Sequence, residues 1–352
     1  MSHPYQSLPA RAYWKTGVAE VNPLQISGLW QPKLKVSPGQ PIITAGSCFA
    51  QHIGRALAAR GFDWFDAEPA PAWLFDEAET FNYGIFSFRT GNIYTARALL
   101  QWLRMAYGEM EPPEEWWHRK GRVYDPLRPA IEPRGFESVE EARASRAATL
   151  VAIRRAVETA RLFVFTLGLT ESWANAETGL EYALCPGTLA GDFDPALHVF
   201  RNHRHAAILA DMEAVLALLA ARNPGLEVLL TVSPVPLTAT ASGEHVLTAT
   251  SRSKATLRAV AGELVEDHPQ VDYFPSYEII THPVFRGMFY APNQRSVVPE
   301  GVEVVMRNFF ADQEAAFGPP KFPKARKGQG ARVRPAAGDV KCEEEMLNAF
   351  AR

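Results

Sequence analysis

Short apolar runs alternate with longer amphipathic stretches through the middle of the chain. The apolar runs cover residues 41–45, 62–65, 162–167, 226–232 and 271–274. Short, mainly apolar runs of this length are typical of buried strands. The stretches between them repeat apolar residues at helical spacing and predict helices near residues 48–60, 92–107, 138–159, 204–222, 251–267 and 300–312. Strands that alternate with helices of this length predict βαβ units, and therefore an α/β fold with a mainly parallel sheet.

The same pattern divides the chain into three parts. Residues 1–40 are rich in Pro, Gly and single aromatic residues, and they predict an irregular arm. Residues 41–315 form the α/β domain. Residues 316–352 begin with Lys and Arg spaced among Pro and Gly, which predicts a disordered basic tail able to meet an acidic partner. The last residues, 342–350, predict a short terminal helix.

The amino-acid composition and the net charge exclude some classes of function. Hydrophobic residues make up 47% of the chain and charged residues 21%, as in an ordinary globular protein. The net charge of −3 gives no electrostatic case for nucleic-acid binding. Three scattered cysteines are too few for a disulfide framework or a zinc site, so we expect no metal. Without an apolar leader or a membrane-length apolar run, the expected location is the cytoplasm. The oligomeric state stays open.

The first strand ends at a turn that carries candidate chemistry. Gly46 and Ser47 follow the strand, and a helix begins directly after them. Ligands bind at the carboxyl ends of the strands in open α/β sheets. The backbone amides at a helix N-terminus point at negative charge that develops nearby. Ser47 is therefore a candidate nucleophile, although strand-Gly-Ser-helix also occurs as a plain helix cap. Cys48 is the alternative nucleophile at the same turn.

Several segments of the chain resemble one known family. They are Gly46-Ser-Cys-Phe-Ala50, Asn82-Tyr-Gly84, the stretch 165–173, Leu184-Cys-Pro-Gly-Thr188, Thr231-Val-Ser-Pro-Val235 and the stretch 273–279. Together they resemble the GSCFA domain family, which is similar to the SGNH (GDSL-like) hydrolases. The resemblance implies a flavodoxin-like three-layer α/β/α sandwich over residues 41–315. It also implies Ser47 as the nucleophile. The sequence shows no Walker motif and no Gly-rich phosphate fingerprint, so we expect no cofactor.

The oxyanion-hole residues follow from the same resemblance. The glycine of the second SGNH block corresponds to Gly84, with Gly91 as the alternative. The third block is Gly-x-Asn in SGNH enzymes, whereas here Thr170 replaces the asparagine and Glu171 follows it. A hydroxyl offers a single donor, so we expect Asn82 to supply a further amide donor or the site to be slow.

This chain differs most from the SGNH pattern at the last of the conserved SGNH blocks. SGNH enzymes carry Asp-x-x-His there, and this chain has Asn293-Gln-Arg-Ser296. A serine without an adjacent base is a weak nucleophile. His245, in the loop after a strand, is the first candidate base, and His282 is the second. Glu278 and Glu171 are the carboxylates placed to orient a base or to act as one.

Two functions remain open from the sequence. In the first, the protein is a serine esterase or O-acyltransferase that forms an acyl-enzyme at Ser47 on an ester of a carbohydrate or a related polar substrate. In the second, the missing Asp-x-x-His marks lost chemistry, and the strand-end cleft of a non-catalytic module binds a glycan or a protein.

Overall fold

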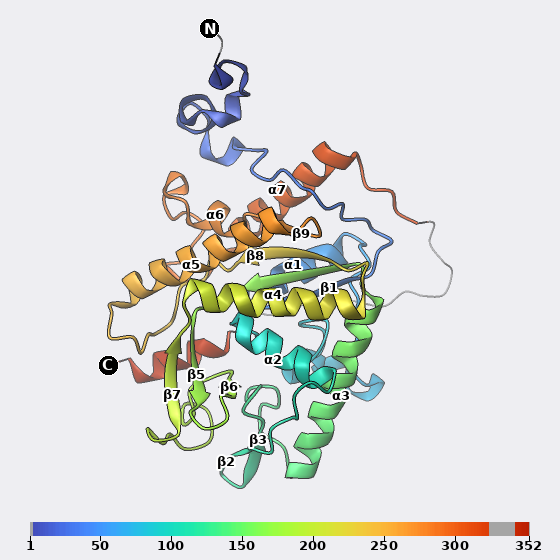
Figure 1. The fold of residues 1–352 in the computed structure, drawn as a ribbon, viewed down its shortest axis with the longest axis vertical. Helices are drawn as coiled ribbons and strands as arrows, with labels where there is room; N and C mark the ends of the chain where they lie inside the picture. Colours follow the sequence, from blue (N-terminus) through green and yellow to red (C-terminus); the bar gives the residue numbers. More distant parts are fainter. Residues whose placement is uncertain (1–2, 324–341, 352) are drawn as a thin grey trace.

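The computed structural model describes residues 3–323 and 342–351, and its centre is a four-stranded parallel sheet (Figure 1). The strand order is β1-β4-β8-β9. The strands are β1 (Ile42–Gly46), β4 (Leu162–Leu167), β8 (Glu227–Val232) and β9 (Val271–Tyr273). Trp64 adds one parallel bridge to Ile42 outside β1. With that bridge the order becomes 2-1-3-4-5, as in flavodoxin-like sheets.

The predicted strand at residues 62–65 is reduced to this single bridge. The reason is competition for the edge of β1. One step further along β1, the backbone N–H of Ser87 donates to the carbonyl of Thr44 at 3.1 Å, and the Thr44 N–H donates to the Ser87 hydroxyl. The loop around Ser87 therefore occupies the position that a longer second strand would need.

Helices cover both faces of the sheet and make a three-layer α/β/α sandwich. One face carries α1 (Ala50–Ala59), α6 (Ser276–Thr281) and α7 (Pro299–Phe317), and the other carries α2 (Ala96–Ala106), α3 (Val139–Thr159), α4 (His205–Arg222) and α5 (Val246–Asp267). Ser138 caps α3 through a hydrogen bond from the Glu141 N–H, as the sequence indicates. Helix α5 starts five residues earlier than predicted, with His245 as its N-cap.

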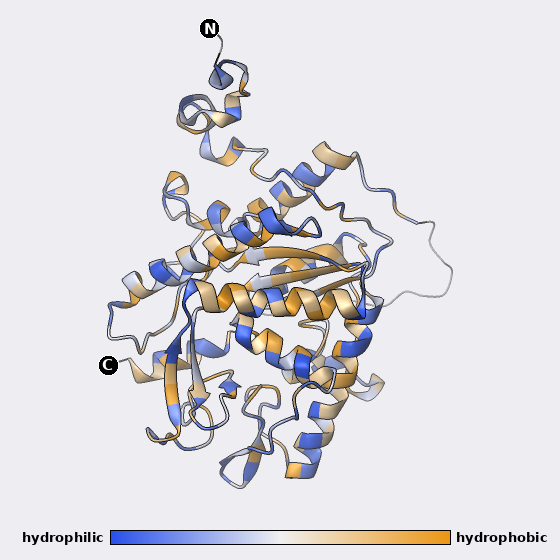
Figure 2. Cartoon of the chain, in the orientation of Figure 1, coloured by the Kyte–Doolittle hydropathy of each residue, from blue (hydrophilic) through white to orange (hydrophobic). Residues whose placement is uncertain are grey.

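Alternate side chains of β4 pack against the helical layers on the two faces of the sheet. Phe163, Phe165 and Leu167 pack into the core beneath α2 to α5, whereas Leu162 and Val164 pack into the core beneath α1, α6 and α7. Alternate residues of a strand point to opposite faces, so a strand covered on both sides must be apolar throughout. Figure 2 shows these central strands in the hydrophobic colour along most of their length.

A second, antiparallel sheet follows β4 directly. Its order is β6-β5-β7, with β5 (Glu171–Asn175), β6 (Glu181–Tyr182) and β7 (His198–Asn202). A separate hairpin pairs β2 (Trp117–Arg119) with β3 (Arg122–Tyr124). These strands are short and polar, which is why apolar runs did not predict them. Because β5 begins four residues after β4 ends, the second sheet lies at the carboxyl edge of the central sheet.

Short helical turns occur in the N-terminal arm and in two loops of the domain, and a 3-10 helix lies near the C-terminus. The arm holds η1 (Pro4–Ser7), η2 (Ala10–Ala12), η3 (Lys15–Ala19) and η4 (Pro23–Gln25), and η5 (Ala72–Phe81) and η6 (Pro283–Phe285) are further such turns. The 3-10 helix η7 (Glu343–Phe350), red in Figure 1, lies beside β5 and β7. Most of the predicted basic tail, residues 324–341, lies outside the described residues.

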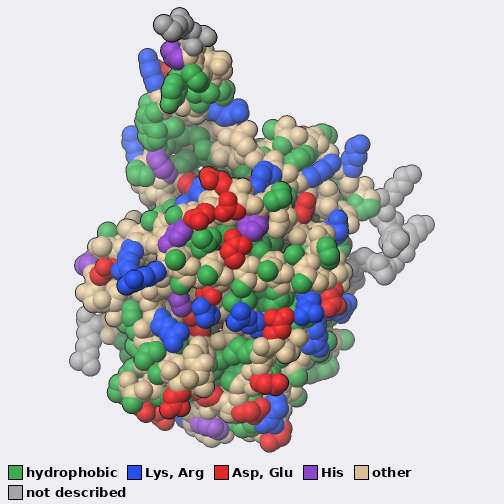
Figure 3. All heavy atoms as spheres, viewed as in Figure 1, with side chains coloured by type: hydrophobic (Ala, Val, Ile, Leu, Met, Phe, Trp, Pro, Cys, Tyr) green, Lys and Arg blue, Asp and Glu red, His purple; other side chains and the backbone are tan. Residues whose placement is uncertain are grey.

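The surface and the helices add two observations. Acidic and basic side chains are interspersed over the face drawn in Figure 3, in keeping with the small net charge. Within the described ranges, no helix combines the length and the apolar character needed to cross a membrane.

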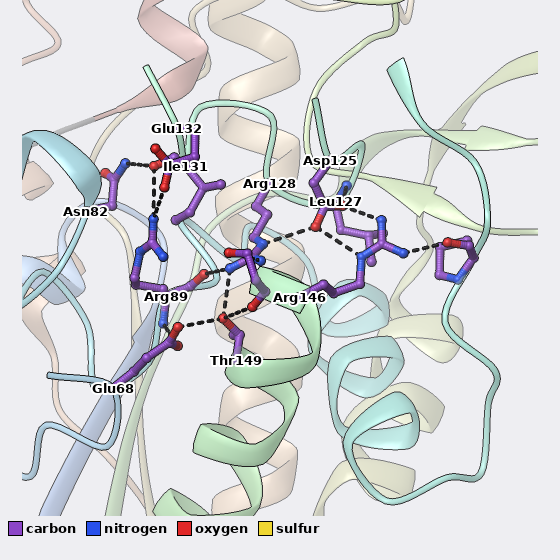
Figure 4. A network of polar contacts seen from close by, with 12 residues as sticks. Glu68, Asn82, Arg89, Asp125, Leu127, Arg128, Ile131, Glu132, Arg146 and Thr149 are labelled. Carbon is purple, nitrogen blue, oxygen red and sulfur yellow. Dashed lines mark hydrogen bonds and ion pairs between the residues drawn. The ribbon is translucent and has the colours of Figure 1, made fainter. Parts of the chain in front are cut away.

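A buried ionic network fixes the long loop between α2 and α3 (Figure 4). Asp125 is fully buried and accepts from two fully buried arginines: Arg128 Nε at 3.0 Å and Arg146 Nη2 at 2.6 Å. Burial alone would raise the pKa of Asp125, but the two guanidinium groups hold it below its usual value. Arg89 and Glu132 form a further ion pair at 2.6 Å beside this network.

Candidate functional site

Ser47 lies at the carboxyl edge of β1 with its hydroxyl unpaired. Gly46 has a φ of 128°, and a Cβ there would lie 2.4 Å from the Thr166 carbonyl oxygen, so only glycine fits the turn. The Ser47 N–H donates to that same carbonyl at 3.1 Å. Ser47 is 2% exposed, and its Oγ has no hydrogen-bond partner among the described residues. An unsatisfied buried hydroxyl is costly and calls for a functional explanation.

Two segments from other parts of the chain flank Ser47. The Ile93 N–H donates to the Gly46 carbonyl at 2.9 Å, which places the segment 91–94 alongside the end of β1. On the other side, the Gly168 N–H donates to the Tyr94 carbonyl at 3.0 Å. A Cβ on Gly168 would lie 2.9 Å from the Ser47 Cβ, so the backbone of Gly168 is packed against the serine.

A carboxylate from the C-terminal segment is bound next to this turn. Glu343 accepts from the Asn92 backbone N–H at 3.4 Å, from the Asn92 Nδ2, and from the Tyr94 hydroxyl at 3.1 Å. Gln51, on the helix that follows Ser47, donates to Asn92 Oδ1 at 3.5 Å and so directs the Asn92 Nδ2 toward Glu343. Backbone N–H, amide and hydroxyl donors that converge on one oxygen pair are the elements of an oxyanion hole.

The block that lacks the expected acid and base supplies an anchor for this segment. Asn293 Oδ1 accepts from the N–H groups of Arg295 and Ser296, which makes a tight Asx turn. The turn presents Arg295, whose side chain is 12% exposed. Arg295 donates to Cys342 Sγ at 3.3 Å and to Glu345 at 3.0 Å. The residues that replace Asp-x-x-His therefore hold the C-terminal segment in place.

A buried lysine lies behind the serine turn. Lys254, on α5, is fully buried, and its Nζ donates to the Gly168 carbonyl at 2.7 Å. Burial lowers the pKa of Lys254 to about 8, although Glu344 opposes the shift. Burial also raises the pKa of Glu344 to about 8. Because Gly168 is packed against Ser47, Lys254 brings an amine that is largely free of its proton above pH 8 to the neighbourhood of the serine.

A cavity of about 530 Å³ opens beside these groups. Asn92, Tyr94 and Glu344 belong to its wall, so it is continuous with the Glu343 site. The wall comes from α2, the β6-β5-β7 sheet, the loop after β8 and η7, and it includes Ala98, Trp102, Leu169, Trp173, Leu184, Phe193, Phe200, Leu237, Leu347 and Phe350. Apolar walls with a few convergent polar groups are typical of ligand pockets.

The two predicted histidine bases serve as helix caps instead. His245 is exposed, and its Nδ1 accepts from the Leu247 N–H at 3.2 Å. His282 Nδ1 accepts from the Val284 N–H at 3.3 Å. Neither histidine is hydrogen-bonded to the Ser47 hydroxyl. In both residues the Nδ1 atom accepts from a backbone N–H two residues further along the chain, which chain order alone does not reveal.

The predicted carboxylates and Thr170 also make hydrogen bonds to groups other than Ser47 or a histidine. Glu278 accepts from Arg258 at 2.6 Å and from the Tyr273 hydroxyl at 2.8 Å, and neither partner is a histidine. The Thr170 hydroxyl donates to Asn202 at 2.8 Å, so it is not directed at an oxyanion. Glu171 lines the cavity, where Thr240 donates to it at 2.9 Å and burial raises its pKa.

Of the residues predicted for the oxyanion hole, Asn82 binds other backbone groups, whereas the alternative glycine, Gly91, lies beside Glu343. The Asn82 amide donates to the carbonyls of Ala130 and Ile131, and Gly84 lies at an exposed turn with open space around it. Gly91, the alternative, lies within the site, since a Cβ there would be 2.9 Å from Glu343 Oε1. The side-chain amide of the next residue, Asn92, donates to Glu343. An asparagine directly after the alternative glycine was the signal that sequence reasoning missed.

Cys48 does not suit the role of alternative nucleophile. Its side chain is 3% exposed. A hydrogen bond with Cys342, together with burial, raises the pKa of Cys48 well above its usual value. The thiolate is the reactive form of cysteine, so a raised pKa makes this thiol a poor nucleophile at neutral pH.

Comparison with known proteins identifies the family. A sequence profile of the GSCFA family matches residues 41–309. The chain belongs to the GSCFA family. A search of curated proteins finds no match. The GSCFA match covers the central sheet, Ser47, Lys254 and Arg295, and it ends before the segment 342–350 that occupies the site. Within residues 3–323 and 342–351, no three His, Cys, Asp or Glu side chains are grouped as metal ligands.

Proposed function

We propose that this GSCFA protein is a serine esterase or O-acyltransferase that forms an acyl-enzyme at Ser47. One observation carries the proposal: the Ser47 hydroxyl is buried and unpaired at the end of β1, and the segment 91–94, which is hydrogen-bonded to Gly46, carries donors that bind a carboxylate. A carboxylate has the planar carbon and two oxygens of an ester's acid product. Glu343 therefore stands where the acid part of a substrate would bind.

The residues at the site can share the steps of acyl transfer. Ser47 Oγ attacks the acyl carbonyl carbon, and the proton passes to the neutral amine of Lys254. The Asn92 and Tyr94 donors stabilise the oxyanion that forms on the carbonyl oxygen. Lys254 then returns the proton to the departing alcohol, and water or a second alcohol releases the acyl group from Ser47. Serine–lysine pairs are a recognised variant of the serine triad.

Lys254 suits the role of base because it is buried. A lysine at its ordinary pKa of about 10.4 is charged at neutral pH and cannot accept a proton. Full burial lowers the pKa of Lys254 to about 8, so a useful fraction is neutral near physiological pH. Its hydrogen bond to the carbonyl of Gly168 holds the amine beside the residue packed on Ser47.

The cavity suggests how an acylated carbohydrate would bind. Leu169 and Leu237 pack with Tyr94 near the oxyanion donors, a suitable surface for an apolar acyl chain. Trp173 lies further along the wall with Phe193 and Phe200, and exposed aromatic faces pack well against the C–H faces of a sugar ring. We therefore propose an ester of a carbohydrate or a similar polar alcohol as substrate.

Release of Glu343 should expose Ser47 to reagents. In the full chain, Glu343→Ala is expected to raise the rate of Ser47 labelling by a fluorophosphonate probe about ten- to hundredfold. The reason is that hydrogen bonds to a charged group contribute about 1.5–3 kcal/mol, and 1.4 kcal/mol is a factor of ten. Gel fluorescence over a time course measures the rate.

Two variants control this labelling experiment. Glu345→Ala removes a half-exposed ion pair with Arg295 from the same segment, and such pairs contribute little, so its rate should stay within about fivefold of wild type. Adding Ser47→Ala to Glu343→Ala should abolish labelling. If Glu343→Ala remains unlabelled, the esterase proposal is wrong, and the non-catalytic binding module takes its place. If labelling survives Ser47→Ala, another residue is the nucleophile, and the assignment of Ser47 is wrong.

A further inference from the structure

A carboxylate and an indole share one face of the β6-β5-β7 sheet. Glu171 and Trp173 lie two residues apart on β5, and alternate residues of a strand point to the same face. Strand β7 places Asn202 opposite Glu171 and Phe200 opposite Trp173. Glu171, Trp173 and Phe200 all line the cavity. This part of the cavity wall therefore has a carboxylate at one end and aromatic rings at the other.

Glu171 is a buried carboxylate that can accept further hydrogen bonds. Its exposed fraction is 9%. The Thr240 hydroxyl shares its proton between the two oxygens at 2.9 Å, Asn202 Nδ2 donates to Oε1 at 3.4 Å, and the Ala241 N–H is a further donor. An ionised carboxylate has about four acceptor positions, so these neutral donors leave room for another. Buried polar groups are normally satisfied, and a ligand in the cavity can supply the missing donor.

The Trp173 ring is held in place by two other aromatic rings. Phe193 lies with its centroid 5.2 Å from that of Trp173 and at 88° to it, and Phe200 lies at 5.6 Å and 60°. Phe193 also lines the cavity, and 45% of its surface is exposed. A ring that is already fixed loses little freedom when a ligand packs on it. Such aromatic surfaces suit the C–H face of a sugar ring.

We propose that Glu171 and Trp173 form a subsite for one sugar ring that has two adjacent free hydroxyl groups. The C–H face of the sugar packs on Trp173, and the hydroxyls donate to the two carboxylate oxygens of Glu171. Two residues of a strand span about 6.8 Å, so hydroxyls at the edge of a six-membered ring on the indole can reach the carboxylate. Thr240 and Asn202 hold the carboxylate in this position.

The position of this subsite also indicates how an acylated sugar lies in the cavity, and this part rests on the proposed function. Along the chain, Glu171 is nearer than Trp173 to Gly168, which is packed against Ser47. The acylated oxygen of the sugar therefore points toward Ser47 and is next to the hydroxyls bound by Glu171. Sugars acylated at one position should be preferred to fully acylated sugars, which have no hydroxyls to donate. Binding of the unacylated sugar does not require Ser47.

Equilibrium binding to the full-length protein tests the subsite without turnover. The probes are the methyl glycosides of glucose, galactose, mannose and xylose, titrated by saturation-transfer difference NMR. Their fully O-methylated forms are the matched ligands, because they keep the ring but have no hydroxyl donors. At least one methyl glycoside should bind, and its O-methylated form should bind at least about tenfold more weakly. Ser47→Ala should bind the glycoside as wild type does, so failure of the esterase proposal would leave this result unchanged.

Variants of the two residues give the decisive comparison. Glu171→Gln keeps the size of the side chain but removes its charge, and charge-assisted hydrogen bonds are roughly twice as strong as neutral ones, so Kd should rise about tenfold. Glu177→Gln is the control, since Glu177 is exposed and lies outside the cavity wall. Trp173→Leu should remove the saturation transfer to the sugar C–H protons, whereas Trp73→Leu, at an 83% exposed tryptophan, should not.

Two outcomes would overturn the proposal. One is that none of the four glycosides binds. The other is that Glu171→Gln leaves Kd within about twofold of the value for Glu177→Gln, which would show that the carboxylate does not recognise the hydroxyls. The Glu171→Gln comparison remains decisive if Trp173→Leu fails to fold.

Discussion

Replacing Lys254 with methionine is expected to slow acylation of Ser47 by about 10²–10⁴-fold, the usual contribution of a general base. Methionine keeps most of the length and volume of the buried side chain, but it has no group that accepts a proton. The substitution also removes the hydrogen bond to the Gly168 carbonyl. The measurement is the rate of p-nitrophenol release from a p-nitrophenyl ester in the Glu343→Ala background, where the site is open.

The pH profile separates a base from a merely structural lysine. The neutral amine is the active form, and burial lowers the pKa of Lys254 to about 8. The acylation rate should therefore rise as the pH increases through about 8 and level off above it. The Lys254→Met variant should lack this step and show a residual rate that does not depend on pH around 8.

Lys33 is the matched control for Lys254. Its Nζ also donates to a backbone carbonyl, that of Val265 at 2.7 Å, but on the exposed surface. Lys33→Met should leave both the rate and the pH profile as in the parent protein. If Lys254→Met retains the step near pH 8, another group is the base, and the assignment of Lys254 is refuted.

Changing Asp125 to asparagine is expected to destabilise the fold by about 3–5 kcal/mol, the usual cost of leaving a buried charge without its partner. The amide has the size of the carboxylate but no charge. Arg128 and Arg146, both fully buried, would lose the one carboxylate that contacts them both within the network of Figure 4. The measurement is the midpoint of urea unfolding, compared at an unchanged slope.

Glu114→Gln tests whether burial is the cause. Glu114 pairs with Arg143, on the same helix as Arg146, but both side chains of this pair are at least half exposed. Its loss should leave the unfolding midpoint nearly unchanged. Equal shifts for Asp125→Asn and Glu114→Gln would contradict the role given to the buried network.

The central sheet could be predicted from the sequence because its strands are buried on both faces. Mainly apolar runs, with helical spacing between them, mark β1, β4, β8 and β9 directly. The β6-β5-β7 sheet lacks that signal, since its strands carry polar residues such as Glu171, Asn175 and Glu181. The strand expected at residues 62–65 failed for another reason: the Ser87 loop, 22 residues beyond Phe65, competes for the same edge.

Only the part of the site that lies in one continuous segment of the chain could be predicted from the sequence. Ser47 follows from a strand-turn-helix pattern in adjacent residues. Asn92 and Tyr94 depend on how the loop before α2 packs along β1, and Glu343 reaches them from 251 residues away. A lysine on a helix is usually expected to face solvent, and only the tertiary packing of the domain buries Lys254. Chain order placed His245 and His282 near the edge, but it could not show that each caps a backbone donor.

The central claim is that Ser47 carries the acyl group during turnover. The most direct measurement is peptide mass spectrometry on full-length Glu343→Ala protein, quenched with acid during hydrolysis of a p-nitrophenyl ester. We predict the added acyl mass on the peptide that contains Ser47, with fragment ions that assign it to the serine, and its absence from the same protein carrying Ser47→Ala. An acyl group on Cys48, Cys342 or Lys254, or ester turnover that persists without Ser47, would contradict the account.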